Sequence, residues 1–213
     1  MFKRAVLLGM VVVTAGTIAG AQTQAPRPQS PAGSSQTQLG GTWGKNARGN
    51  NVYQNGKWLE ITYGRPIKRG RELFGTGADY AKNIVIDGAK VWRAGANVST
   101  RLKTEAALEI GGKKVPAGEY SVFIDTKSPS DWTLNVSSWA AQQTYDPNNK
   151  EALWGSFEYT PDKDVARAPM AVSKLPISID ELTWNFADVT ATGGKLVLMW
   201  DTVVATVPFK LAS

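Results

Sequence analysis

The sequence has 213 residues, which is enough for one folded domain or at most two small ones. It contains no histidine and no cysteine, so Ser-His-Asp triads, Cys-His pairs, histidine-ligated zinc sites, thiol chemistry and disulfide bonds are all excluded. The formal net charge is +6, but the charges are scattered and form no basic stripe, so we expect no nucleic-acid partner.

The first 21 residues have the three parts of a secretory signal peptide. Lys3 and Arg4 are positively charged, residues 5–18 are mostly apolar, and residues 19–21 (Ala-Gly-Ala) match the small-residue cleavage pattern. A membrane anchor is the alternative, but the apolar run is short compared with the roughly 20 residues that span a bilayer. We therefore predict that residues 1–21 are removed. The mature protein would then be extracytoplasmic (periplasmic or secreted), without stable membrane insertion.

Residues 22–38 are rich in glutamine, proline, serine and threonine and contain hardly any apolar side chains. A segment of this composition buries too little apolar surface to offset the entropy that it would lose on folding. We predict a disordered tether over residues 22–38 and a folded domain over residues 39–213.

The first strand of the domain is expected at residues 58–63. Leu59, Ile61 and Tyr63 recur at every second position, which places them on one face of a strand. Pro66 ends the strand, because proline donates no hydrogen bond to a β-ladder.

A β-hairpin is expected further along the chain. Residues 83–86 and 90–93 flank an Asp87-Gly88 pair, which is a strong turn signal between two strands. Short apolar–polar segments separated by glycine or proline turns follow, and each predicts a strand. They lie at residues 106–110, 119–125, 132–136, 165–172, 182–186, 196–200 and 203–211.

This pattern predicts the fold class. After the N-terminal segment, no long stretch shows the 3.6-residue period of an amphipathic helix. Many short strands joined by turns are typical of an all-β protein, and we predict a single antiparallel β-sandwich with a jelly-roll-like arrangement.

Few residue types remain that could support catalysis. Glu60, Glu109, Asp125 and Asp201 lie in predicted strands, where two of them could meet across a sheet, although solvated carboxylates are far commoner there. Residues 75–77 are only a fragment of a glycine-rich nucleotide fingerprint, and the chain has no P-loop and no calcium-binding loop. We predict no cofactor and no metal ion, and we leave enzymatic activity open.

The chain has eight tryptophans, which is a rich content for this length. Strand parity assigns Trp184 and Trp200 to the core, whereas Trp139 and Trp154 lie in an irregular region and are better candidates for exposure. An exposed tryptophan would offer a stacking surface for a sugar ring or another flat ligand.

Two arginines lie at predicted strand ends beside glycine, where loops gather and sites form. Arg65 follows Gly64, and Arg93 precedes Gly95 and Asn97. A guanidinium group suits carboxylate, phosphate or sulfate, so we predict a ligand site at Arg65, Arg93 and Asn97. The alternative is that each arginine pairs with an internal carboxylate or binds loop carbonyls, and that the small residues between them form a tight corner.

Several motifs, in this order, resemble an exported bacterial family catalogued as domain of unknown function 2911. The resemblance covers roughly residues 40–211 and implies a secreted or periplasmic β-rich protein, with no established activity to transfer. Two departures stand out, since Val98 replaces a usually acidic residue and residues 74–87 are longer than usual. The motifs are residues 63–66 (YGRP), 68–71 (KRGR), 90–97 (KVWRAGAN), 113–120 (KKVPAGEY), 131–133 (DWT), 154–157 (WGSF) and 207–209 (VPF).

Three hypotheses about function follow. The favoured ones are a module that binds a small anionic or carbohydrate ligand, and an accessory protein of the cell envelope. A carboxylate-dependent hydrolase is the alternative, which requires two carboxylates within about 5–10 Å of one another in an open cavity.

Overall fold

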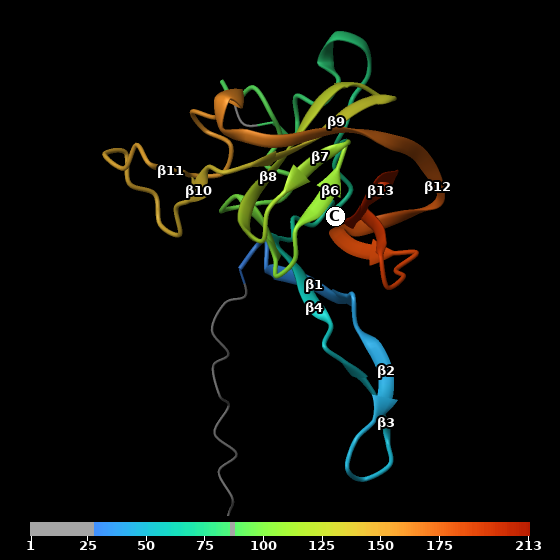
Figure 1. Cartoon of the computed structure of the whole chain (residues 1–213). Coiled ribbons are helices and arrows are strands. Elements are labelled where there is room, and N and C mark those ends of the chain that lie inside the picture. The colour runs from blue at the N-terminus through green and yellow to red at the C-terminus, as the bar shows by residue number, and fades with distance from the viewer. Residues whose placement is uncertain (1–27, 86–87) are drawn as a thin grey trace, which may run out of the picture.

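The computed structural model describes residues 28–85 and 88–213, and Figure 1 shows its architecture. Nine strands form one antiparallel sheet in the order β1-β4-β5-β8-β9-β12-β13-β6-β7. The predicted all-β, antiparallel fold is therefore confirmed. The strands are β1 (Ala32–Leu39), β4 (Lys57–Gly64), β5 (Thr100–Thr104), β6 (Leu108–Ile110), β7 (Lys113–Val115), β8 (Gly118–Ser128), β9 (Asp131–Ser137), β12 (Asp164–Ala187) and β13 (Gly193–Leu211).

The long strand β12 turns this single sheet into two facing layers. Its first part pairs with β9 as far as Met170, and its second part pairs with β13 from Ala171 onward, with register shifts within the second part. In Figure 1, β12 arches across the molecule between these two partners. A hydrogen bond from Ser35 Oγ in β1 to Asn185 Oδ1 in β12, at 3.0 Å, joins the two layers.

Both layers contribute side chains to one hydrophobic core. The predicted alternation in β4 is confirmed, because Leu59, Ile61 and Tyr63 are all buried there. They lie in the same cluster as Trp184 of β12 and Leu198 of β13. Strands from distant parts of the sequence therefore share a single interior, as expected for one domain.

Three small groups of elements lie outside the main sheet. β2 (Thr42–Lys45) and β3 (Asn51–Gln54) form a hairpin that projects from the body of the molecule (Figure 1). β10 (Ala140–Ala141) and β11 (Ala152–Leu153) pair in parallel, and two 3₁₀ helices lie at Gly77–Asp79 and Pro161–Lys163. The described part of the chain contains no helix with the length and hydropathy needed to span a membrane.

The N-terminal prediction was partly wrong. Residues 1–27, which include the expected signal peptide, lie outside the described residues. The expected tether over residues 22–38 overlaps β1, which pairs along its whole length with β4. A strand at the edge of a sheet needs backbone hydrogen bonds and only one buried face, so a polar sequence suffices.

The predicted hairpin around Asp87-Gly88 was also wrong in its strands. Residues 83–85 form turns, and Trp92 makes only an isolated bridge to Ile124. Asp87 itself lies outside the described residues. The buried ring of Trp92 decides the path of this segment, because burial of a large aromatic side chain outweighs a local turn preference.

Candidate functional site

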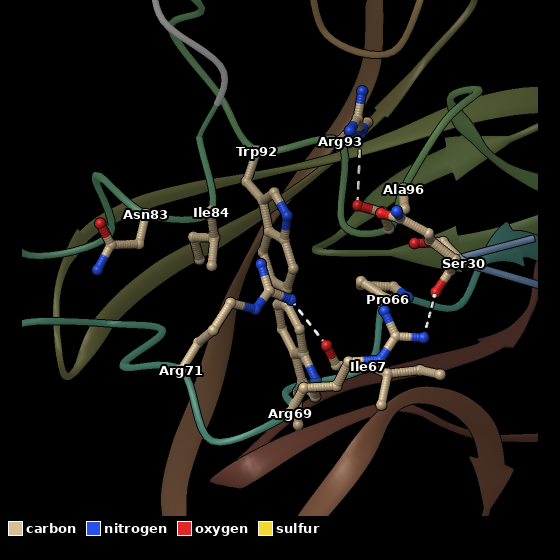
Figure 2. Close-up of a pocket in the computed structure, with 13 residues that line it drawn as sticks. Ser30, Pro66, Ile67, Arg69, Arg71, Asn83, Ile84, Trp92, Arg93 and Ala96 are labelled. Atoms are coloured by element: carbon tan, nitrogen blue, oxygen red, sulfur yellow. Dashed lines mark hydrogen bonds between the residues drawn. The ribbon is translucent and has the colours of Figure 1, made fainter.

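A cavity of about 400 Å³ opens where β4 ends (Figure 2). Five segments border it: the chain that leaves β4, a loop near residue 83, the corner that follows Trp92, residues 29–30 before β1, and Trp200 of β13. Its volume lies in the range of small-molecule sites. The lining residues are Gln29, Ser30, Pro66, Ile67, Arg69, Arg71, Asn83, Ile84, Trp92, Arg93, Gly95, Ala96 and Trp200.

The corner at residues 94–96 is built from small residues because backbone approaches backbone there. A Cβ atom on Gly64 would lie 2.0 Å from the carbonyl oxygen of Ala96, and a Cβ on Gly95 would lie 2.8 Å from Thr100 Oγ1. The Ala96 amide donates to the Gly64 carbonyl at 3.1 Å. Larger side chains at these glycines would push the corner away from β4.

Hydrogen bonds fix the same corner from the other side. The Ala94 carbonyl accepts bonds from Trp184 Nε1 at 2.9 Å and from Thr100 Oγ1 at 3.1 Å. Ala94 has a φ of +53°, which is unusual for a residue with a side chain. The two donors are buried and compensate for that strained backbone. The Ala-Gly-Ala segment is therefore a structural corner.

Arg93 leaves this corner at the edge of the cavity, and its guanidinium is directed away from Arg69 and Arg71, toward Asn97 and Gly155 (Figure 2). Its Nε donates to the Gly95 carbonyl at 3.4 Å, and Nη1 donates to the Asn97 carbonyl at 3.1 Å. A Cβ on Gly155 would lie 2.9 Å from Nη1, so this glycine makes room for the arginine. Burial lowers the pKa of the Arg93 guanidinium. The group is thus partly desolvated and held by backbone carbonyls alone.

Two further arginines enter the cavity from the chain after β4. Arg71 donates from Nε to the Lys68 carbonyl at 3.0 Å and from Nη2 to the Ile67 carbonyl at 2.7 Å. Arg69 donates from Nη2 to the Gln29 carbonyl at 3.4 Å. Figure 2 shows both side chains on the same side of the cavity. Each guanidinium carries five N–H donors, so most of the donors here have no partner in the described protein.

The charge of the cavity is unbalanced. Within residues 28–85 and 88–213, no aspartate or glutamate lines it, and Arg69, Arg71 and Arg93 form no ion pair. Guanidinium groups bind carboxylates and phosphates through paired N–H bonds. The arrangement is therefore suited to an anion that carries more than one negative charge.

Of the three predicted site residues, one lines the cavity. Arg93 is there, but Arg65 pairs with Glu181 at 2.6 Å and is not among the lining residues. Asn97 is not a lining residue either, and its Nδ2 donates to the carbonyl of Ser30, which is one. Arg65 thus follows the alternative interpretation, in which the arginine pairs with an internal carboxylate. Asn97 does not line the cavity, but it holds Ser30, which does.

Sequence reasoning missed Arg69 and Arg71 as site residues. The available signal was the Lys-Arg-Gly-Arg segment that follows Pro66. Gly70 has a φ of +73°, and the Arg71 amide donates to the Lys68 carbonyl at 3.1 Å, so the segment is a turn. A basic turn directly after a strand end brings two arginines to one place.

Two tryptophans, Trp92 and Trp200, line the cavity. The rings of Trp92 and Trp200 stack with centroids 6.0 Å apart and planes 13° apart. Trp184 and Trp200 are buried, as predicted.

Trp139 and Trp154, which were the better candidates for exposure, are only partly exposed. The exposed tryptophans are Trp43 and Trp58, with 74% and 47% of their surfaces accessible.

The four carboxylates named by the sequence have separate partners. Glu109 pairs with Lys210 at 3.1 Å, Asp201 with Lys68 at 2.5 Å, and Asp125 with Arg167 at 3.6 Å. Glu60 accepts a hydrogen bond from Gln36 at 2.6 Å. In the described part of the chain, no cluster of three or more acidic side chains could hold a metal ion.

One carboxylate pair does line a common cavity. Glu60 and Glu105 both border a hollow of about 250 Å³ on the outer face of the sheet, together with Trp58 and Lys103. The Glu105 carboxylate accepts a hydrogen bond from the Trp58 amide at 2.9 Å, and Glu105 is exposed. A general acid needs a carboxyl group whose pKa is raised, usually by burial, so this open pair does not have the environment of a catalytic acid.

Comparison with known proteins gives one result. A family model described as "Protein of unknown function (DUF2911)" matches residues 47–209. No curated protein and no solved structure matches the chain. The match confirms the resemblance that the sequence motifs indicated.

Proposed function

Because this chain belongs to the DUF2911 family of proteins of unknown function, we propose its function from the site: it is an exported protein that binds a small polyanionic molecule. The observation that carries this proposal is the group of three arginines around one cavity, with no carboxylate among its described lining residues. A partly desolvated guanidinium without a counter-ion is unfavourable, and an anionic ligand removes that cost.

The chemistry of the cavity favours a compact ligand with two or more carboxylate or phosphate groups. Backbone carbonyls hold Arg71 through Nε and Nη2 and Arg69 through Nη2, so their remaining N–H donors are already oriented. Such preorganisation lowers the entropy lost on binding. Asn83 adds an amide to the lining, and Ile67 and Ile84 add apolar surface for the body of the ligand.

Export rests on the N-terminal sequence and on composition. Residues 1–21 have the pattern of a cleaved signal peptide, and the absence of cysteine leaves stability to the core in any compartment. We propose a periplasmic or secreted location. Isolation of the protein from a cell fractionation and sequencing of its N-terminus tests this, with Gln22 expected as the first residue. An intact Met1 on a cytosolic protein would contradict it.

An enzyme is the less supported function. A carboxylate-dependent hydrolase would use Glu60 and Glu105, but Glu105 is exposed and Glu60 is only partly buried, so neither has the enclosed setting of a general acid. Burial does raise the pKa of Asp164, yet Asp164 does not line the arginine cavity or the hollow beside Glu60. Binding is therefore preferred to catalysis.

Thermal unfolding with candidate anions tests the binding function. Citrate, inorganic phosphate, pyrophosphate and sulfate would each be added to the full chain. A ligand at about 100 times its Kd stabilises the folded state by about 2.7 kcal/mol, which raises Tm by about 5–10 °C for a domain of this size. We expect such a shift for at least one polycarboxylate or phosphate.

Arginine variants locate the effect. Arg71→Gln and Arg93→Gln should each lose most of the shift, measured against the ligand-free Tm of the same variant. Arg48→Gln is the matched control, because it removes one positive charge from the exposed hairpin, far from the lining residues. An equal shift in all three variants would mean that the anions act non-specifically. No shift with any anion would favour the accessory role.

A further inference from the structure

A second surface lies on the outer face of β1, β4 and β5. Leu59 and Ile61 of β4 point into the core, so Trp58, Glu60 and Thr62 point outward by the two-residue period of a strand. The sheet register sets Gln38, Gln36 and Ser34 of β1 opposite these three residues. The register with β5 sets Lys103 opposite Glu60 and Arg101 opposite Thr62. The face is therefore a ladder of polar side chains with one tryptophan.

Three hollows follow this ladder and share residues. The first, about 560 Å³, is bordered by Trp43, Tyr53 and Trp58. The second, about 250 Å³, is bordered by Trp58 and Glu60, and the third, about 380 Å³, by Glu60 and Thr62. Because Trp58 and Glu60 each border two hollows, the three form one groove along the strands. None of its lining residues lines the arginine cavity.

The aromatic end of this groove is built around the ring of Tyr53. The Trp43 and Tyr53 rings meet edge to face with centroids 5.5 Å apart. The hydroxyl of Tyr53 accepts the Gly41 amide at 3.0 Å. A Cβ on Gly41 or Gly56 would lie 2.5 Å or 2.7 Å from the Tyr53 ring, so both glycines leave room for it. The Tyr53 ring is thus held in place, and the Trp43 ring that meets it edge to face is largely exposed.

The composition of the groove fits a sugar chain. Aromatic rings pack against the apolar faces of sugar rings, while amide, carboxylate and hydroxyl groups hydrogen-bond to sugar hydroxyls. The charged lining residues are two of each sign, Glu60 and Glu105 against Arg101 and Lys103, so the groove has no net charge. Among the described lining residues, Val189 is the only exposed large aliphatic side chain, so apart from its aromatic rings the groove is largely polar.

The tip of the β2–β3 hairpin argues against a membrane as the occupant. Residues 46–50 are Asn-Ala-Arg-Gly-Asn, and Asn46 Oδ1 accepts the amides of Arg48 and Asn50. A hairpin that enters a bilayer carries its aromatic residues at the tip, whereas here they lie at the base and face the groove.

We propose that this outer face, together with the β2–β3 hairpin, binds a neutral polysaccharide chain. Trp43, Tyr53 and Trp58 stack on consecutive sugar units, and the polar ladder around Glu60 bonds to the hydroxyls of the units that follow. The site is separate from the anion cavity, so the two functions succeed or fail independently.

Affinity electrophoresis tests the proposal. The full chain would migrate toward the cathode in native gels that contain galactomannan, xyloglucan or mixed-linkage β-glucan. Retardation by at least one of them is expected, with affinity reduced about tenfold in Trp43→Ala and Trp58→Ala. Tyr145→Ala is the matched control, because Tyr145 is 52% exposed and also meets a tryptophan edge to face, at 6.4 Å from Trp154. Trp58→Tyr should keep most of the affinity.

Other outcomes would overturn the proposal. Migration unaffected by all three polysaccharides would do so, and so would retardation that is equal in wild type and both alanine variants. Self-association in sedimentation that disappears in Trp43→Ala, without retardation, would assign the surface to a second copy of the chain. Binding to anionic phospholipid vesicles without retardation would assign it to a membrane.

Discussion

Replacement of Gly64 by alanine tests whether the corner beside the arginine cavity is fixed by backbone contact. Gly64 ends β4 and lies against residues 94–96. An added Cβ would be 2.0 Å from the Ala96 carbonyl oxygen and 2.7 Å from its carbonyl carbon. Both atoms are backbone, so no side-chain rotation relieves the clash.

The expected loss of stability follows from two effects. The corner must retreat by roughly 1 Å or more to reach ordinary contact, and such overpacking costs about 1–3 kcal/mol. The retreat also breaks the bond from the Ala96 amide to the Gly64 carbonyl, which contributes about 1 kcal/mol. Gly64→Ala should therefore lower the free energy of unfolding by about 2–4 kcal/mol, and Tm by about 5–15 °C.

Denaturant and thermal unfolding, followed by circular dichroism, measure this loss. Gly44→Ala is the control, because its added Cβ would meet only the flexible end of Gln54, at 3.0 Å from Oε1. That variant should change stability by less than about 0.5 kcal/mol. If Gly64→Ala is no less stable than Gly44→Ala, the corner is not held against β4 and the argument for a rigid rim fails.

Three further variants separate structural from functional roles. Burial raises the pKa of Asp164 above its usual 3.8, so the folded state loses stability as pH rises from that value through the folded pKa. Asparagine does not titrate, so Asp164→Asn should gain stability relative to wild type over that rise in pH. Urea titrations at a series of pH values measure the difference, and a difference that is the same at every pH would contradict this. Arg65→Gln should cost only about 0.2–1 kcal/mol, because its ion pair with Glu181 is partly exposed, and should leave anion-induced shifts in Tm intact. Asn97→Gly keeps the φ of +62° but loses the bond to Ser30, so anion binding should weaken while Tm changes little.

Strands with one buried face could be predicted from the sequence because apolar and polar side chains alternate along them with a two-residue period. Leu59, Ile61 and Tyr63 alternate, and a one-residue error would have exposed all three. The same logic assigned Trp184 and Trp200 to the core. Alternation reports burial, so it locates strands that contribute to the core.

β1 left no such signal, since its place is determined by its partner. Only Leu39 is buried in this strand, most of the other residues are polar, and Ser35 reaches the facing layer through a hydrogen bond instead of apolar packing. Pairing with β4 supplies the stabilisation through backbone hydrogen bonds. The local composition indicates correctly that this segment would not fold alone. It carries no information about β4, the strand with which the segment pairs.

The site was predicted in part for a similar reason. Arg93 could be found because it lies next to small residues at a strand end. Arg65 has the same local setting, and its pairing with Glu181 depends on a strand more than 100 residues away in sequence. Arg65 and Arg93 look equivalent in the local sequence, and only the tertiary fold decides that Arg65 has a carboxylate partner within the protein.

The corner and the anion cavity depend on the same contacts. Trp184 and Thr100 hold the Ala94 carbonyl, and Gly64 holds Ala96, so the backbone that follows Arg93 is fixed without any charge. A guanidinium held in this way needs no carboxylate for its orientation. Its charge therefore remains available, and a structural corner of small residues becomes the means by which an arginine is presented to a ligand.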